Sequence, residues 1–430
     1  MLKAFANAFK VPDLRRKILF TLLIIAVYRF GAHVPTPGID VDAAQQIAAS
    51  GSTDGVLQFI NLFSGGALTQ MAVFALGIMP YITASIIMQL LTVVIPKLEQ
   101  WSKEGEQGHK KITQWTRYLT VVLAILQSTG IAFLFHRGAD QLGFPPGVQL
   151  IPDFSFKNVS LIVITLTAGT ALIMWLGELI TQRGIGNGMS ILIFASIVST
   201  LPNELLSIQR QEPMGVFLGL MAIAVFIVIA IVFIEQGQRR IPVQYAKRVV
   251  GRRMYGGTST YIPLKVNQAG VIPIIFASSV LYIPTLLQNV IQNAGIQNWI
   301  SQNIIDSTAL THMVLYGLLV VFFTYFYTAI TFNPVDVADN MKKYGGFIPG
   351  IRPGRQTAEY LDRILTRLTL PGAIFIAAIA LLPNIFLARF GIQALPFGGT
   401  SILITVGVTL ETMKQIESQL MMRHYEGFLK

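Results

Sequence analysis

The sequence contains no cysteine. Disulfide bridges, thiolate nucleophiles and cysteine-ligated metals are therefore excluded. The absence of cysteine does not indicate whether the protein works in an oxidising or a reducing compartment. Charged residues are also scarce, at 12% of the 430 residues, whereas 53% of the residues are hydrophobic. Soluble domains carry about 25% charged residues, so this composition is typical of polytopic membrane proteins. We expect an all-α chain that crosses a membrane many times.

The motifs of common enzymes and nucleotide-binding proteins are also missing. No G-x-x-x-x-G-K-[ST] segment occurs, so no phosphate-binding loop is visible and any driving energy must come from elsewhere. No H-E-x-x-H segment occurs and the five His residues are scattered, so we expect no metal site. Ser64 lies in a Gly turn, but no His is placed to activate it. We expect neither enzymatic activity nor a bound cofactor.

Carboxylates are absent from the interiors of the apolar segments, because Glu178 and Glu411 lie at segment ends. Ion- and proton-coupled transporters commonly place carboxylates or His within the bilayer, so a proton relay is disfavoured. A Na⁺ site built from hydroxyl and carbonyl oxygens needs no such group. The alternatives are therefore a conduit without internal chemistry and a Na⁺-coupled secondary transporter of a small solute.

Ten long apolar segments are present, and each is a predicted membrane span. The fifth and the tenth are short for a spanning helix. Short, Gly-flanked segments in corresponding places favour a five-plus-five arrangement, with halves at residues 1–202 and 203–430, although no residue-level repeat accompanies it. The first span carries Arg29, lacks an obvious cleavage site and is expected to be retained. The ten spans are Ile18–Val34, Phe74–Ile95, Trp115–Phe135, Ser160–Leu176, Met189–Leu201, Met214–Ile234, Ala269–Leu287, Ala309–Phe332, Leu368–Phe386 and Phe397–Leu410.

The segment Val56–Ile95 is apolar almost throughout and is interrupted once, at Gly65-Gly66. As one helix it would be about 60 Å long, twice the ~30 Å thickness of the hydrocarbon core. Glycine adopts backbone angles closed to other residues, so we expect the helix to break at this pair. The break leaves a short piece, Leu57–Phe63, and a full-length span, Phe74–Ile95. The short piece is predicted to be a re-entrant element in a pore or a buried half-helix.

Positive charge alternates along the chain. If the N-terminus is cytoplasmic, 27 of the 32 Lys and Arg residues fall in inside segments, four fall outside and Arg29 lies within a span. This distribution obeys the positive-inside rule and predicts that both termini are cytoplasmic. Most of the net charge of +11 is then explained by the orientation of the chain in the membrane, and nucleic-acid binding is the weaker explanation for this charge.

Two inside loops are larger than the topology requires. The first, Glu235–Lys265, holds seven Lys or Arg, and its residues Thr258–Ile262 favour an extended or hairpin projection. The second, Asn333–Arg367, has a Gly- and Pro-punctuated tip that presents Arg352 and Arg355. Contact with anionic membrane lipids is one interpretation. Ordered projecting tips favour the other, a docking surface for a soluble partner.

Seven runs spread over nearly the whole chain carry a family resemblance. They are NLFSGGALTQ, FALGIMPYITASIIMQLL, RGIGNGMSILIFA, QRRIPVQYAKR, GVIPIIFASS, FNPVDVADNMKKYGGFIPGIRPG and YLDRILTRLTLPGA. The chain resembles the SecY family, the channel subunit of the bacterial Sec protein translocase. The resemblance implies ten helices in two pseudo-symmetric five-helix halves around an hourglass pore, hinged between spans five and six. It also implies a lateral gate, formed by spans two and three with spans seven and eight.

The implied activity is a protein-conducting channel that translocates unfolded secretory proteins across the bacterial inner membrane and inserts membrane proteins into it. The implied partners are SecE-like and SecG-like small membrane subunits, the SecA motor ATPase, the ribosome, signal sequences, nascent chains and membrane lipids.

The resemblance also assigns roles to residues. A plug that closes the resting pore would lie at about residues 57–70. Narrow apolar constrictions exclude water and block ions, as an aliphatic pore ring would. Ile78 and Ile82 lie one helical turn apart, although alone they would equally suit a core or a lipid-facing surface. The implied residues are, for the plug, Leu57, Phe59, Ile60, Asn61, Leu62, Phe63, Ser64, Gly65 and Gly66; for the ring, Ile78, Ile82, Ile193, Ile275 and Ile404; and for docking, Arg239, Arg240, Arg252, Arg253, Arg352 and Arg355.

Overall fold

The computed structural model describes residues 9–50, 61, 63–137, 150–211, 213–245, 248–250, 253–255, 259–288, 293–390 and 399–426. The chain forms two compact units. The first consists of Met1–Phe217, Ser279–Ala309 and Val408–Lys430, and the second of Leu218–Ser278 and Leu310–Gly407. The predicted division into residues 1–202 and 203–430 stays a prediction.

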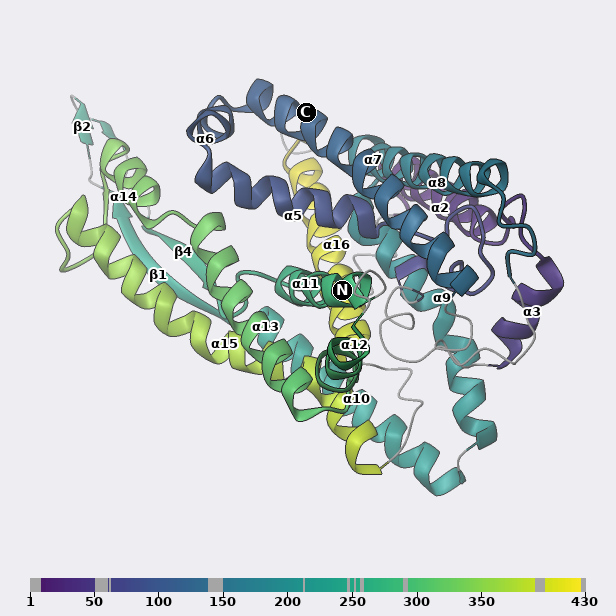
Figure 1. Cartoon of the computed structure of the whole chain (residues 1–430). Helices are drawn as coiled ribbons and strands as arrows, with labels where there is room; N and C mark the ends of the chain where they lie inside the picture. Colours follow the sequence, from purple (N-terminus) through teal and green to yellow (C-terminus); the bar gives the residue numbers. More distant parts are fainter. Residues whose placement is uncertain are drawn as a thin grey trace. The chain divides into compact units, whose positions relative to one another are not determined.

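The first unit is a bundle of long helices. Helix α7 runs beside α8 (Figure 1), α5 packs against α7, and α2 packs against both α8 and α9. Their apolar faces form a core that includes Ile131, Ile162 and Leu166, together with Leu68 and Met71 from the turns that precede α5. The helices are α2 (Pro12–Gly31), α3 (Val41–Ser50), α5 (Met79–Val94), α6 (Pro96–Lys103), α7 (Glu106–Arg137), α8 (Phe156–Arg183) and α9 (Gly188–Gln211), with α12 (Ala294–Ile300) and the π-helical turn η1 (Ser301–Ile305) further along the chain.

The prediction of one full-length span over Phe74–Ile95 is wrong. Residues 65–78 form turns and an isolated bridge, and α5 begins only at Met79. It ends before Ile95, which has an extended backbone because Pro96 follows it. The chain then turns by 101° into α6.

The second unit joins helices to a small sheet. Helix α13 (Leu310–Thr331) packs against α15 (Arg355–Phe390), and α14 (Pro334–Lys343) also packs against α15. Helix α10 (Met214–Gln236) lies almost wholly in this unit, while α11 (Ile272–Gln288) and α16 (Gly399–Glu426) each contribute residues to both units. All ten predicted spans therefore coincide with a helix over most of their length.

Both large loops contribute to one sheet. Strands β1 (Gln238–Tyr245) and β4 (Ser259–Lys265) pair in antiparallel fashion, and β5 (Gly346–Phe347) pairs with the other edge of β1. Between them, β2 (Arg248–Val250) and β3 (Arg253–Tyr255) form a hairpin. The predicted extended conformation is thus confirmed for residues 259–262. The sheet lies beside α14 and α15 (Figure 1) and shares with them a core that includes Ile241, Val243, Leu264 and Leu361.

Six helices among the described residues are long and apolar enough to cross a membrane, and seven if the bent pair α5 and α6 counts as one span. The six include Gly188–Arg210, so the expectation that the fifth span is short is wrong. The coarse expectation of a mostly helical, multi-pass chain agrees with this structure.

Candidate functional site

The site begins where the short apolar piece meets Gly65-Gly66. Asn61, Phe63 and Ser64 are helical, and the two glycines follow with φ of +65° and +88°. The Gly66 amide donates to the Asn61 carbonyl at 3.0 Å, which is the six-to-one bond of a Schellman motif. The predicted helix break at this glycine pair is confirmed.

Short-range hydrogen bonds make the turn a compact body. The Ser64 hydroxyl donates to the Asn61 carbonyl and accepts from the Leu68 amide, at 3.1 and 3.2 Å. The Thr69 hydroxyl donates to the Gly66 carbonyl at 2.9 Å. Ser64 is fully buried and its hydroxyl satisfies local backbone groups, which explains the residue without any nucleophilic role.

Arg29 contacts this turn from another element. It lies in the last turn of α2, and its Nη1 donates to the Gly65 carbonyl at 2.8 Å. A Cβ on Gly65 would lie 2.7 Å from the same Nη1 and 3.1 Å from the Ser196 Cα of α9. A side chain on Gly65 would therefore press on both α2 and α9, at a φ that side chains rarely adopt.

Tyr28, the residue before Arg29, holds α2 against Ser196 of α9 and against Phe74. The Tyr28 and Ser196 hydroxyls lie 2.6 Å apart, and the Tyr28 ring stacks on Phe74 with centroids 5.8 Å apart. Both Tyr28 and Ser196 are completely buried. A buried phenol that is hydrogen-bonded and stacked has little freedom, so the backbone that carries Arg29 is fixed.

The chain after the turn packs against the segment that follows α2 and against α8. The Val73 amide donates to the Val34 carbonyl at 2.8 Å, next to the bridge between Pro35 and Ala72. A Cβ on Gly169 of α8 would lie 2.0 Å from the Val73 carbonyl oxygen, so this backbone passes directly over α8. Met71 takes a positive φ of 44° and is fully buried. An apolar backbone without helical bonds is thus kept inside protein, as membrane depth requires.

Parts of the predicted plug lie outside the described residues, namely Leu57, Phe59, Ile60 and Leu62. Its described members are Asn61, Phe63, Ser64, Gly65 and Gly66, and of these Phe63 and Ser64 are fully buried. The structure thus places the described part of the predicted plug within the helical bundle of the first unit.

All five residues of the predicted pore ring are buried, with exposed fractions between 1% and 8%. Ile78, Ile82 and Ile193 belong to the first unit, and Ile275 and Ile404 to the second. The Ile82 amide donates to the Ile78 carbonyl at 3.1 Å, which places these two residues one turn apart as expected. Whether the five encircle a pore stays a prediction.

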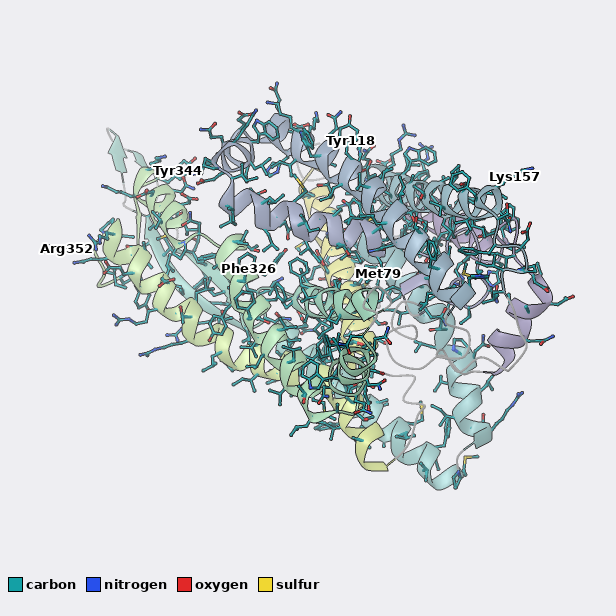
Figure 2. All side chains as sticks on the ribbon, viewed as in Figure 1. Met79, Tyr118, Lys157, Phe326, Tyr344 and Arg352 are labelled. Carbon is teal, nitrogen blue, oxygen red and sulfur yellow. The ribbon has the colours of Figure 1, made fainter. Side chains whose placement is uncertain are left out.

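The predicted docking arginines are divided between two parts of the second unit. Arg239 and Arg240 are exposed on β1, and Arg352 and Arg355 are exposed near the start of α15. Arg355 also pairs with Glu359 at 2.9 Å. Figure 2 shows Arg352 and Tyr344 at the end of this unit where the hairpin of β2 and β3 lies. Arg252 and the side chain of Arg253 lie outside the described residues.

Sequence reasoning missed two features of this site. It left Arg29 as a charge within a span, without assigning it the Gly65 carbonyl 36 residues away. It also missed the pairing of β1 with β5, which ties together the two basic loops through Gln244 and Phe347. A lone arginine in an apolar segment is a signal that a partner must exist, but it does not say which.

The family model described as SecY matches residues 72–413. The chain belongs to the SecY family. The protein translocase subunit SecY of Streptomyces coelicolor is 60% identical to it, and that of Mycobacterium bovis is 55% identical, each over the full length of both chains.

Solved structures agree with the SecY fold. One described as a protein conducting channel has a TM-score of 0.64 at 18% identity, covering 94% of this chain and 91% of its own. A second, described as showing that the SecY plug domain stabilises the closed state and maintains a membrane seal, has a TM-score of 0.63 at 19% identity and the same coverage. At these identities the likeness shows the fold alone.

Proposed function

We propose that this chain is the protein-conducting channel of a bacterial Sec translocase. The observation that carries the proposal is the full-length similarity to SecY subunits at 55–60% identity. The turn at Gly65-Gly66, packed against α2 and α9, adds a physical reason. An apolar segment that enters a helical bundle and turns within it suits a stopper better than a spanning helix.

In this proposal the ten apolar helices form two five-helix halves around an hourglass pore in the inner membrane, with both termini in the cytoplasm. Residues 57–70 act as the plug, and the five isoleucines form the constriction. The burial of Ile78, Ile82, Ile193, Ile275 and Ile404 supports an inward rather than a lipid-facing position. An aliphatic ring excludes ions by dewetting and offers a passing polypeptide no strong binding site.

The driving energy comes from partners. The exposed arginines of β1 and of the tip before α15 would dock the SecA motor ATPase or the ribosome, since exposed guanidinium groups bind carboxylates and phosphates well. SecE-like and SecG-like subunits would support the bundle. Signal sequences would leave sideways into lipid through a gate between spans two and three and spans seven and eight.

Crosslinking tests the proposal directly. Because the chain lacks cysteine, Ile82→Cys introduces a single thiol at the predicted constriction. A stalled secretory chain with one cysteine should form a disulfide with this thiol in native membranes. Ile164→Cys on the exposed face of α8 is the control and should give no disulfide with the stalled chain. Equal crosslinking at both positions, or none at Ile82→Cys, contradicts the proposal.

The transporter alternative has a different signature. A Na⁺-coupled transporter would accumulate a small solute in vesicles that contain the chain alone, and uptake would saturate with solute concentration. A channel for unfolded proteins should show no such saturable uptake. No observation on this structure favours the transporter.

A further inference from the structure

Arg29 lies in the interior of the first predicted span, whereas Arg117 is only two residues from the start of its span, so the position of Arg29 needs an explanation. A cation within an apolar segment is costly, so such residues usually serve a function and have an identifiable partner. Here the cost is reduced in two ways. The guanidinium lies near the C-terminus of α2, where the helix dipole favours positive charge, and it donates to the Gly65 carbonyl.

The accepting carbonyl belongs to Gly65, which directly follows the short helix. The carbonyl of a residue just beyond a helix receives no intrahelical hydrogen bond, so it can accept one from an outside donor. The contact at 2.8 Å is a hydrogen bond from a charged group to a backbone oxygen, which is stronger than a neutral one. Because it involves the backbone, it depends on where the turn lies and not on the side chains of residues 57–66.

The surroundings make the contact sensitive to position. Gly65 is crowded on both sides, because a Cβ there would lie 2.7 Å from the Arg29 Nη1 and 3.1 Å from the Ser196 Cα. The Tyr28 contacts with Ser196 and Phe74 fix the backbone beneath Arg29. In contrast, the hydrogen bonds among Asn61, Ser64, Gly66, Leu68 and Thr69 join the turn to itself, so they persist if the turn moves as a body.

We propose that Arg29 is the positioning residue of the plug, holding the Gly65 carbonyl against α2 while the channel rests and releasing it when the turn moves out. This inference rests on the proposed function, because it assumes that the turn is the movable stopper. It assigns the resting position of the stopper to one cation on α2, in addition to the apolar contacts of Phe63 and its neighbours.

Labelling of a single cysteine tests this role. Gln70→Cys provides one half-buried thiol just after the turn, in a chain that otherwise has none. In that background, Arg29→Met should raise the rate of labelling by a membrane-impermeant maleimide at least about tenfold, since a hydrogen bond to a charged group is lost. Arg29→Lys keeps the charge and one donor, and should restore most of the protection. Arg210→Met removes a charge from an exposed position on α9 and should leave the rate unchanged.

A second variant disturbs the same contact by changing Gly65 instead of Arg29. Gly65→Ala places a methyl group against the Arg29 Nη1 and should raise labelling as Arg29→Met does, so the test survives if one variant fails to fold. An unchanged labelling rate in both variants overturns the inference. Ion conductance of the resting channel in planar bilayers separates the two proposals. Faster labelling with higher conductance supports both the Arg29 contact and the proposed plug. Faster labelling with unchanged conductance supports the Arg29 contact but shows that the turn does not seal the resting channel.

Discussion

Arg117 of α7 and Glu178 of α8 form a two-pronged ion pair. Nε lies 2.7 Å from one carboxylate oxygen and Nη2 lies 2.6 Å from the other. The Glu178 side chain is only 16% exposed, so water screens the pair incompletely. Planar guanidinium and carboxylate groups matched in this way fix orientation as well as distance. The pair therefore fastens two helices of the first unit in one register.

We expect Glu178→Gln to destabilise the protein by about 1–2 kcal/mol, because it removes the charge from a carboxylate that is only 16% exposed and accepts two hydrogen bonds from Arg117. The measurement is the midpoint of unfolding in detergent. Glu99→Gln is the matched control, since it breaks an exposed pair with Lys103 that contributes at most about 0.5 kcal/mol. Equal losses of stability in both variants would show that the two-pronged geometry of the Arg117–Glu178 pair contributes no stability beyond that of an exposed ion pair.

The pore ring gives the second prediction. Ile82→Asn and Ile275→Asn each replace a buried aliphatic side chain with one that binds water, so the resting channel should conduct ions. Conductance in planar bilayers measures this leak. Ile82→Val keeps the side chain aliphatic, so the resting channel of this variant should not conduct ions. If the Asn variants are as tight as the parent chain, these residues do not form the seal.

Local signals explain why much of this fold is predictable. Gly65 and Gly66 mark a break because they adopt φ values closed to other residues, and both do so here. Apolar length predicts the helices, since each of the ten predicted spans coincides with a helix over most of its length, and six of these helices, or seven with the bent pair, are long and apolar enough to cross a membrane. The extended projection after Glu235 follows from β-branched and polar residues, and β1 and β4 pair there.

Contacts distant in sequence explain the failures. Residues 71–78 are apolar and read as helix, but the Val73 amide bonds to Val34 instead, and Met71 takes a positive φ. Tertiary packing thus overrides a local preference. The partner of Arg29 and the pairing of β1 with β5 are likewise non-local. The turn before α6 has a local cause instead, because Pro96 disfavours a helical backbone at Ile95 and so predicts that α5 ends there.

The tip before α15 gives the third prediction. Arg352→Glu reverses the charge of an exposed side chain and should abolish transport driven by SecA, while the protein still inserts into the membrane. Transport of a secretory precursor into inverted vesicles is the measurement. Arg363→Glu makes the same change on the exposed side of α15 and should retain most transport. Full transport by the Arg352→Glu chain would refute the docking role.

The fourth prediction concerns the core beneath the two basic loops. Leu361 is fully buried among residues of β1, β4 and α14, so Leu361→Ala should cost about 2–5 kcal/mol in that core. Both loops should loosen together, because β1 pairs with β4 and with β5. Limited proteolysis should then cut both loops faster. Val335→Ala removes an exposed side chain of α14 and should leave cleavage unchanged, whereas cleavage of one loop alone would argue against a shared unit.

The last prediction concerns Gly169 of α8, beneath the chain that follows the turn. A methyl group there would lie 2.0 Å from the Val73 carbonyl oxygen, and because that atom is backbone it cannot rotate away. Gly169→Ala should therefore displace residues 71–75, destabilise the first unit by about 1–3 kcal/mol and open an ion leak. Gly219→Ala is the matched control, since a methyl group on α10 meets no atom within 4 Å and alanine favours a helix by about 1 kcal/mol. Gly169→Ala alone should lower the unfolding midpoint and raise the resting conductance, whereas Gly219→Ala should leave the conductance unchanged and the midpoint equal or higher. A tight and stable Gly169→Ala channel would mean that the backbone over α8 is free to shift and does not help to hold the stopper.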